Sequence, residues 1–266
     1  MYTSMHFKFV KRLQAAENSI FYSIVQRDDK LLAIGRLFYN QRLIKMMTLD
    51  EYFNVLDDNI PILIKGEDPR CFYHNSQLYI QDNYWNDMHI INVDDDYKST
   101  AVNIFGKNIS FISRGKRLYF IHYMAPFTLY EFEAETGEIF PVNVYTNCEN
   151  FEYRGGTPGY HLQDDVYYGF GHRTYISDNN TLLHDVFYWE VDFSYDKPYI
   201  TIYDIIQPDA FLNICDPTSV IEINHRRYLV TAESNFPWFQ PQDYVTNIYE
   251  ITHAPSNYHQ SQKQID

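Results

Sequence analysis

The chain repeats one pattern, a short aromatic-rich strand, a tight polar turn and a second such strand, and this repetition most constrains its fold. Copies begin near residues 67, 107, 154 and 216, at intervals of 40, 47 and 62 residues, and a hairpin over 19–39 makes a fifth unit. Further strands are expected after most of these hairpins. A period of roughly 40–50 residues with about four strands in each unit is typical of propeller blades.

No helical periodicity of 10–15 residues alternates with these strands, which argues against a parallel α/β sheet. We therefore predict an all-β fold, a single five-bladed β-propeller over residues 1–266. Residues 1–18 are expected to form a lead-in arm and residues 252–266 a flexible tail. A β-sandwich is the alternative fold.

The composition excludes some functions. A formal net charge of −14 argues against general nucleic-acid binding, which needs a basic face. The three cysteines, Cys71, Cys148 and Cys215, are far apart and odd in number, which fits reduced thiols and a cytoplasmic location. We find no signal peptide or membrane span and no metal-ligand spacing, and so predict neither a metal nor a cofactor. The oligomeric state is not predicted.

Polar or charged motifs open the repeating units. In a propeller, the innermost strand of each blade starts near the central channel, so motifs at matching positions should converge on one axial pocket. The motifs are Glu67-Asp68-Pro69-Arg70, Lys107-Asn108, Arg154-Gly155-Gly156 and Asp216-Pro217.

The turn that starts at Arg154 is the most distinctive of these motifs. Gly155 and Gly156 mark a backbone that turns sharply and that something approaches closely. A strand later, the chain delivers His172, and the two cationic side chains together suit an anionic or polyhydroxyl ligand. Arg36 lies inside an apolar strand, where it either faces outward or projects into a site.

The Glu-Asp-Pro-Arg opening, the Lys-Asn opening and the Arg-Gly-Gly-Thr-Pro turn with its downstream Gly-His resemble the five-bladed propellers of glycoside hydrolase family 130, the β-mannoside phosphorylases, and their glycosyltransferase-like relatives. The resemblance covers roughly residues 18–251. It implies that basic side chains bind inorganic phosphate, which attacks the anomeric carbon with inversion. By motif, the residues that bind phosphate or the donor would be Arg36, Arg70, Lys107, Arg154 and His172.

The resemblance also implies acid and sugar-binding residues. Asp68 would hold a sugar hydroxyl or orient Arg70. The position of the family's acid falls at Asn86 or Asp87, with Asp82 also near, and Asp68 and Asp87 are the candidate catalytic residues. Asn108 and Asp216, at two of the blade openings, are candidates for sugar binding, and Trp85 is a candidate for stacking on a sugar.

The main functional prediction is therefore a carbohydrate-active enzyme that transfers a glycosyl group, with inorganic phosphate or an activated sugar as a reactant. Two alternatives remain open. A propeller glycoside hydrolase would need two carboxylates, for which Asp68 and Asp216 are the candidates, on opposite sides of the channel. A non-catalytic glycan-binding propeller is the other alternative, because no acid stands clearly at the family's position.

Overall fold

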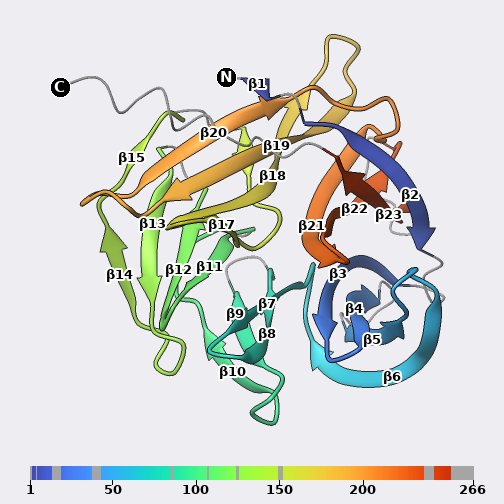
Figure 1. Cartoon of the computed structure of the whole chain (residues 1–266), viewed down its shortest axis with the longest axis horizontal. Helices are drawn as coiled ribbons and strands as arrows, with labels where there is room; N and C mark the ends of the chain where they lie inside the picture. The colour runs from blue at the N-terminus through green and yellow to red at the C-terminus, as the bar shows by residue number, and fades with distance from the viewer. Residues whose placement is uncertain are drawn as a thin grey trace.

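Figure 1 shows a computed structural model of the chain. The structure describes residues 2–3, 5–13, 19–37, 43–84, 87–106, 108–123, 126–148, 152–236 and 243–252, with the backbone alone over 2–3 and 59–63. These residues form β-strands and no α-helix. In this part of the chain there is accordingly no helix that could cross a membrane.

Three antiparallel sheets of four strands each follow one another along the chain. Blade 1 contains β3 (Ser19–Arg27), β4 (Lys30–Leu37), β5 (Leu43–Leu49) and β6 (Val55–Lys65). Blade 2 contains β7 (Arg70–His74), β8 (Gln77–Asp82), β9 (His89–Asn92) and β10 (Lys98–Ala101). Blade 3 contains β11 (Ser110–Arg114), β12 (Arg117–His122), β13 (Thr128–Phe132) and β14 (Ile139–Val142).

The remaining described strands form two blades, whose strands pair with one another at one position, between His184 and Ile214. Blade 4 contains β16 (Tyr153–Arg154), β17 (Tyr160–Gln163), β18 (Val166–Ile176), β19 (Leu182–Asp192) and β20 (Tyr199–Ile205), with β1 (Tyr2–Thr3) and β15 (Tyr145–Thr146) along β20. Blade 5 contains β21 (Ile214–Ile223), β22 (Arg226–Ser234), β23 (Val245–Ile251) and β2 (Phe7–Leu13).

The hydrophobic core shows that these sheets close into a ring. Five clusters of buried side chains each join two neighbouring blades, and one of them packs Tyr22 of blade 1 against Val230 of blade 5. Because both faces of a blade are covered, inner strands are buried almost continuously, as β3 is over its first seven residues. The predicted all-β five-bladed propeller is confirmed, and the β-sandwich alternative is wrong.

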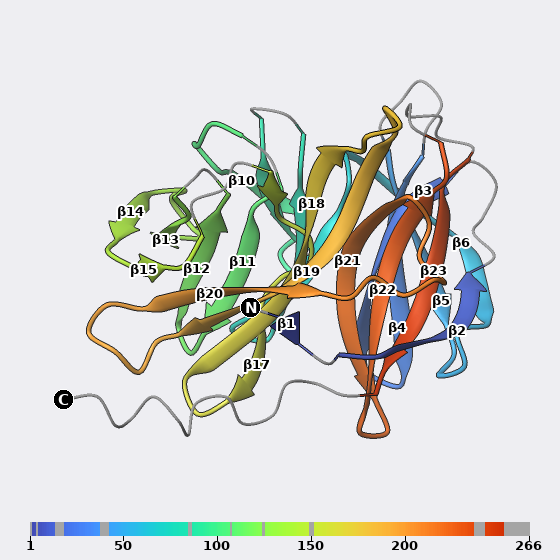
Figure 2. The same ribbon diagram turned by 90° about the horizontal axis from the view of Figure 1, so that it is seen from above.

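The N-terminal segment supplies a strand that the repeat pattern left out. β2 pairs with β23 as the outer strand of blade 5, so this blade combines both ends of the described chain. β1 runs parallel to β20 of blade 4, and Figure 2 shows it beside that strand. The N-terminal segment therefore links two neighbouring blades. The predicted tail lies outside the described residues from residue 253 onward.

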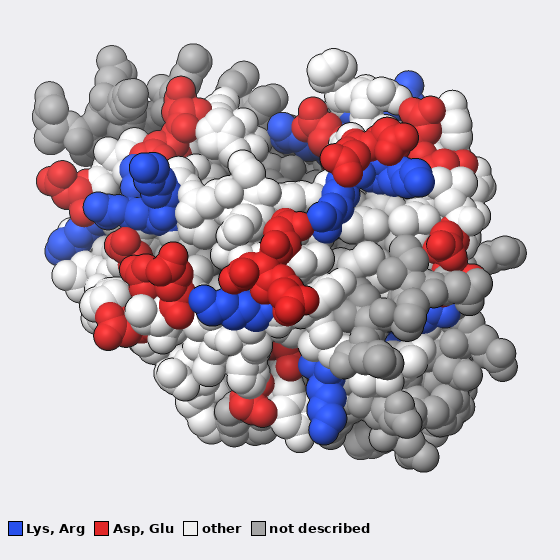
Figure 3. Space-filling view, turned by 90° about the horizontal axis from the view of Figure 1, so that it is seen from below, with Lys and Arg blue, Asp and Glu red and all other residues white. Residues whose placement is uncertain are grey.

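Charged side chains do not form one large basic patch on the face seen in Figure 3. Acidic and basic groups lie next to one another there. The ion pairs of the described residues include that of Arg114 with Asp165. The three cysteines are buried and unpaired with one another.

Candidate functional site

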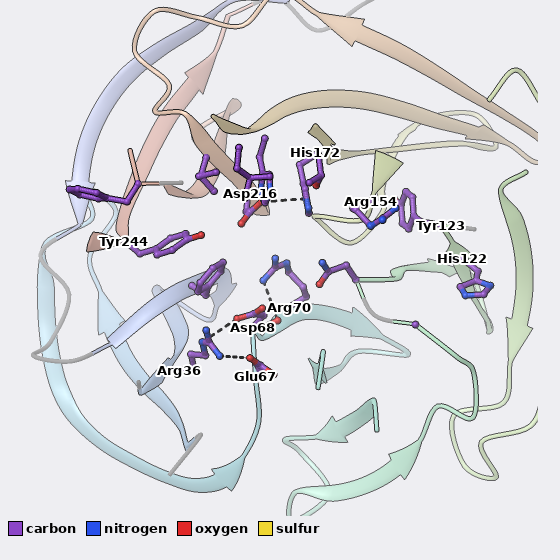
Figure 4. Close-up of a pocket in the computed structure, with 18 of the residues that line it drawn as sticks. Arg36, Glu67, Asp68, Arg70, His122, Tyr123, Arg154, His172, Asp216 and Tyr244 are labelled. Atoms are coloured by element: carbon purple, nitrogen blue, oxygen red, sulfur yellow. Dashed lines mark hydrogen bonds and ion pairs between the residues drawn. The ribbon is translucent and has the colours of Figure 1, made fainter. Parts of the chain in front are cut away.

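A cavity of about 620 Å³ opens at the end of the channel where the inner strands begin. Side chains from all five blades line it (Figure 4). Seven residues that the sequence predicts for the site are among them: Arg36, Asp68, Arg70, Asn108, Arg154, His172 and Asp216. The predicted convergence of the blade openings on one axial pocket is therefore seen in the structure.

Three other predicted residues are not in this group. Lys107 and Trp85 lie outside the described residues. Asp87 lines a separate surface hollow with Met88, and its side chain is 68% exposed. Asp87 is not among the residues that line the cavity.

Arg36 projects from β4 into the cavity wall and is neutralised there. Its Nη1 donates to Oε1 of Glu67 at 2.6 Å, and its Nε lies 3.1 Å from Oδ1 of Asp68. The guanidinium also lies over the ring of Phe21, 5.2 Å from its centroid. Of the two orientations open for Arg36, the structure shows the one that faces the site.

Asp68 has a different partner from the one expected. Its carboxylate pairs with Arg36, whereas its backbone carbonyl accepts a hydrogen bond from Nη1 of Arg70 at 3.2 Å. Asp68 has a left-handed backbone with φ of 46°, which directs its side chain and its carbonyl to different neighbours. The expectation that the Asp68 side chain orients Arg70 is not what the structure shows.

Arg70 begins β7 and is only 2% exposed. Its Nε donates to the carbonyl of Gly156 at 2.9 Å, and its Nη1 donates to the carbonyls of Asp68 and Pro69. Burial lowers the pKa of Arg70, against the attraction of nearby Asp68 and Asp216. Arg70 therefore holds two blade openings together at the floor of the cavity.

The turn after Arg154 requires glycine because neighbouring backbone lies too close for a side chain. A Cβ at Gly155 would lie 1.7 Å from the carbonyl oxygen of Asn108, and one at Gly156 would lie 2.4 Å from that of Phe170. The close approach that the sequence predicts is thus an approach of neighbouring strands. It leaves the exposed Arg154 side chain at the cavity wall.

Asp216, His184 and His172 form a compact polar group in the cavity wall. Figure 4 shows Asp216 and His172 on the opposite side of the cavity from Arg36. Nδ1 of His184 donates to Oδ1 of Asp216 at 2.7 Å, and Nδ1 of His172 lies 3.5 Å from the same oxygen. The two imidazole rings are stacked, with centroids 4.8 Å apart.

The pKa values of the two histidines are shifted in opposite directions. Burial lowers the pKa of His172 to about 3, although Asp216 opposes this shift. Burial also acts to lower the pKa of His184, but the attraction and hydrogen bond of Asp216 outweigh it and the pKa is raised. For Asp216, burial would raise the pKa, but the two histidines outweigh it and the pKa lies below its ordinary value. The group therefore combines a charged Asp216, a His184 that keeps its proton to higher pH than an ordinary histidine, and a His172 that is neutral near pH 7.

The same three side chains offer ligand atoms within 4.8 Å of one another, the separation that a bound metal ion requires. The set does not suit one. Nδ1 of His184 is occupied by Asp216, and both Arg70 and Arg154 act on this group with positive charge. A hard cation such as Ca²⁺ would also require more oxygen ligands. We therefore interpret the group as a hydrogen-bonded pair with a stacked neighbour.

Aromatic side chains surround these polar groups. Phe105 and Phe236 are more than half exposed at the cavity, and Tyr244 packs on Phe21 with ring centroids 4.8 Å apart. Burial and the charges of Asp216 and Asp68 raise the pKa of Tyr244, which places its hydroxyl in the field of both carboxylates. Rings with a polar edge suit the faces and hydroxyls of a sugar.

The sequence pattern places neither His184 nor Tyr244 in the site. His184 lies on the third strand of its blade, away from any blade opening. The only signal for His184 is the pairing of β18 with β19. This pairing sets His184 opposite Thr174, two residues along β18 from His172. Tyr244 immediately precedes β23, beyond the last predicted blade opening.

No protein-family model matches the chain, and no curated protein matches it in sequence. Solved structures do match. A GH43 β-xylosidase/α-arabinofuranosidase from a compost microbial metagenome, in complex with xylotriose and calcium-free, has a TM-score of 0.61 and 10% identity over 94% of this chain and 96% of that chain. A GH43_1 enzyme from Xanthomonas citri with xylose has a TM-score of 0.61 and 10% identity over 95% and 92% of the two chains. A Bacillus subtilis arabinanase has a TM-score of 0.55 and 11% identity over 91% and 96%. At these identities the similarity shows the shared fold.

Proposed function

We propose that the protein hydrolyses a glycosidic bond of a carbohydrate held in the channel cavity. The observation that carries this proposal is the placement of Asp68 and Asp216 in one cavity, from different blades, with the Tyr244 hydroxyl in the field of both. The exposed aromatic rings at the rim provide surfaces for sugar faces. Two of the compared structures hold xylotriose or xylose, which makes pentose glycans the first substrates to test.

Hydrolysis requires a base for the attacking water and a proton donor for the leaving oxygen. Asp68 suits the role of base, because Arg36 at 3.1 Å favours its charged form. Asp216 cannot itself supply the proton near neutral pH, since its pKa lies below the ordinary value. Its place beside His184 instead stabilises a positive charge on that side of the cavity.

The charges of the cavity favour hydrolysis over phosphate transfer. Arg36 is neutralised by Glu67 and Asp68, and His172 stays uncharged with a pKa of about 3. Arg70 donates three hydrogen bonds to backbone carbonyls. The basic cluster expected from sequence is thus much less cationic than its residue types indicate, and a free phosphate ion would gain less there.

The proposal is tested by product analysis. Aryl and oligomeric β-xylosides, α-arabinofuranosides and β-mannosides are incubated with the protein, with and without inorganic phosphate. We expect the free reducing sugar in both conditions. An Asp68→Asn variant should lose at least about 100-fold in kcat, the scale for losing general base catalysis. The matched control is Asp164→Asn, at an exposed surface turn.

Two outcomes would overturn this proposal. Formation of a sugar 1-phosphate only when phosphate is present would show phosphorolysis instead. Saturable binding of the same sugars without turnover would show a glycan-binding propeller, because the carboxylates and aromatic rings would then serve recognition alone. A thermal melt of each variant separates loss of activity from loss of fold.

A further inference from the structure

We infer that His184, held by Asp216, donates the proton to the leaving oxygen of the glycoside. This inference rests on the proposed function and identifies the acid that Asp87, exposed outside the cavity, does not provide. The geometry that carries it is an imidazole in the cavity wall, fixed at one ring nitrogen by Asp216. Figure 4 shows Asp216 across the cavity from the paired Arg36 and Asp68.

The hydrogen bond to Asp216 fixes both the orientation and the proton of the ring. Nδ1 donates to Oδ1 of Asp216 at 2.7 Å, so the opposite nitrogen, Nε2, is the one that can exchange a proton with a ligand. Among the described residues, none forms a hydrogen bond with Nε2 of His184, and the side chain is 16% exposed in the cavity wall. This leaves Nε2 for a group that enters the cavity.

The surrounding charges support a protonated ring. Asp216 faces it from β21, neutral His172 stacks on it from β18, Arg154 acts on it from β16, and Asp185 follows it in β19. The negative charges outweigh Arg154 and the burial, and the pKa of His184 is raised. His172 does not compete for the proton, because burial keeps its pKa at about 3.

The step balances without any further reactant. The bond between the anomeric carbon and the leaving oxygen breaks, and its electron pair goes to that oxygen, which takes the proton from Nε2 of His184. Water forms the new bond to the anomeric carbon and gives its proton to Asp68. The proton then returns through solvent from Asp68 to His184, and the products are the free sugar and the alcohol.

The test compares leaving groups in a His184→Gln variant. A methyl or sugar leaving group needs a proton, whereas 2,4-dinitrophenolate leaves without one. We therefore expect kcat to fall about 10²- to 10⁴-fold on the disaccharide, the usual contribution of general acid catalysis, and by less than about 10-fold on the 2,4-dinitrophenyl glycoside. His161→Gln, at an exposed position of β17 where Nε2 meets the carbonyl of Asp164, is the matched control.

A second variant covers the case in which His184→Gln does not fold. Asp216→Asn keeps a hydrogen-bond acceptor beside Nδ1 but removes the negative charge, so the upper limb of the pH–rate profile should move to lower pH. The inference would be overturned if His184→Gln lowered kcat by the same factor on both substrates. It would also be overturned if the high-pH limb of the pH–rate profile were unchanged in Asp216→Asn. If the wild-type protein cleaves neither substrate, the proposed hydrolysis itself fails instead.

Discussion

Nε of Arg70 in blade 2 donates a hydrogen bond to the carbonyl oxygen of Gly156 in blade 4, over a distance of 2.9 Å. These two blades are not neighbours in the ring, since blade 3 lies between them. The bond therefore crosses the channel floor, and it joins two of the motifs that the sequence singles out. A side chain predicted to bind phosphate is thus part of the framework that shapes the cavity.

Arg70→Lys should consequently destabilise the fold. A lysine has a single nitrogen and cannot replace the donors that reach Gly156, Asp68 and Pro69 together. Each buried carbonyl left without a donor costs about 1–3 kcal/mol, so we expect the free energy of unfolding to fall by about 2–4 kcal/mol in urea titrations. Arg117→Lys, at a side chain 64% exposed, should change it by less than about 0.5 kcal/mol. Equal stability of the two variants would show that Arg70 has no clamping role.

Gly155→Ala should also destabilise the protein, for a steric reason. The added Cβ would lie 1.7 Å from the Asn108 carbonyl oxygen and 2.7 Å from the Tyr123 ring, so β16 has to move away from blade 3. Overpacking of this kind costs about 1–3 kcal/mol or more.

Gly115→Ala provides a comparison for this substitution. At Gly115 a Cβ meets nothing within 4 Å, and only the left-handed φ of 56° is unfavourable for alanine, by about 1 kcal/mol. Thermal melts should therefore show the larger loss for Gly155→Ala. A larger loss for Gly115→Ala would contradict the packing argument.

Arg154→Lys tests a side chain at the cavity wall. The variant keeps the positive charge but loses the planar fork that can contact two oxygen atoms of a ligand. We expect kcat/KM for the best glycoside to fall by about 2 kcal/mol of transition-state stabilisation, with little change in the melting temperature because the residue is exposed. Arg173→Lys, at a side chain paired with Asp185 outside the cavity, is the control. Unchanged kinetics in Arg154→Lys would remove this residue from the site.

The sequence predicts the blades well because each blade is built from hairpins, whose strands are close in the sequence and are joined by short turns. The strand from Arg117 to His122 belongs to the unit predicted to begin near residue 107, and it pairs across a tight turn with the strand that precedes it in the sequence. The outer strand of blade 5 could not be predicted in this way. β2 pairs with β23 across almost the whole chain, and nothing within Phe7–Leu13 specifies that partner.

The site likewise has a part that the sequence predicts and a part that it does not. Residues at blade openings, such as Asp68 and Asp216, are brought together by the ring itself, so repetition alone locates them. Their partners depend on individual side-chain geometry. The Asp68 carboxylate pairs with Arg36 and not with Arg70 because the backbone at Asp68 is left-handed. The repeat pattern does not specify that conformation.

Asp82 provides the last prediction, which concerns stability and pH. Its Oδ1 accepts hydrogen bonds from the backbone N–H groups of Glu67 and Tyr84, and burial raises its pKa to about 6 in spite of them. Between about pH 4 and 6 the folded protein therefore binds more protons at this residue than the unfolded chain. As a result, its contribution to stability decreases as the pH rises through this window.

Asp82→Asn should remove that pH dependence. The amide oxygen can accept the same two hydrogen bonds, but it carries no charge to bury. We expect the variant to match the wild type near pH 4 and to be more stable by about 1–3 kcal/mol at pH 8, in urea titrations at both values. Asp164→Asn, at an exposed turn, should show no such difference. A variant less stable than the wild type at pH 8 would mean that the Asp82 charge stabilises the fold, contrary to the burial argument.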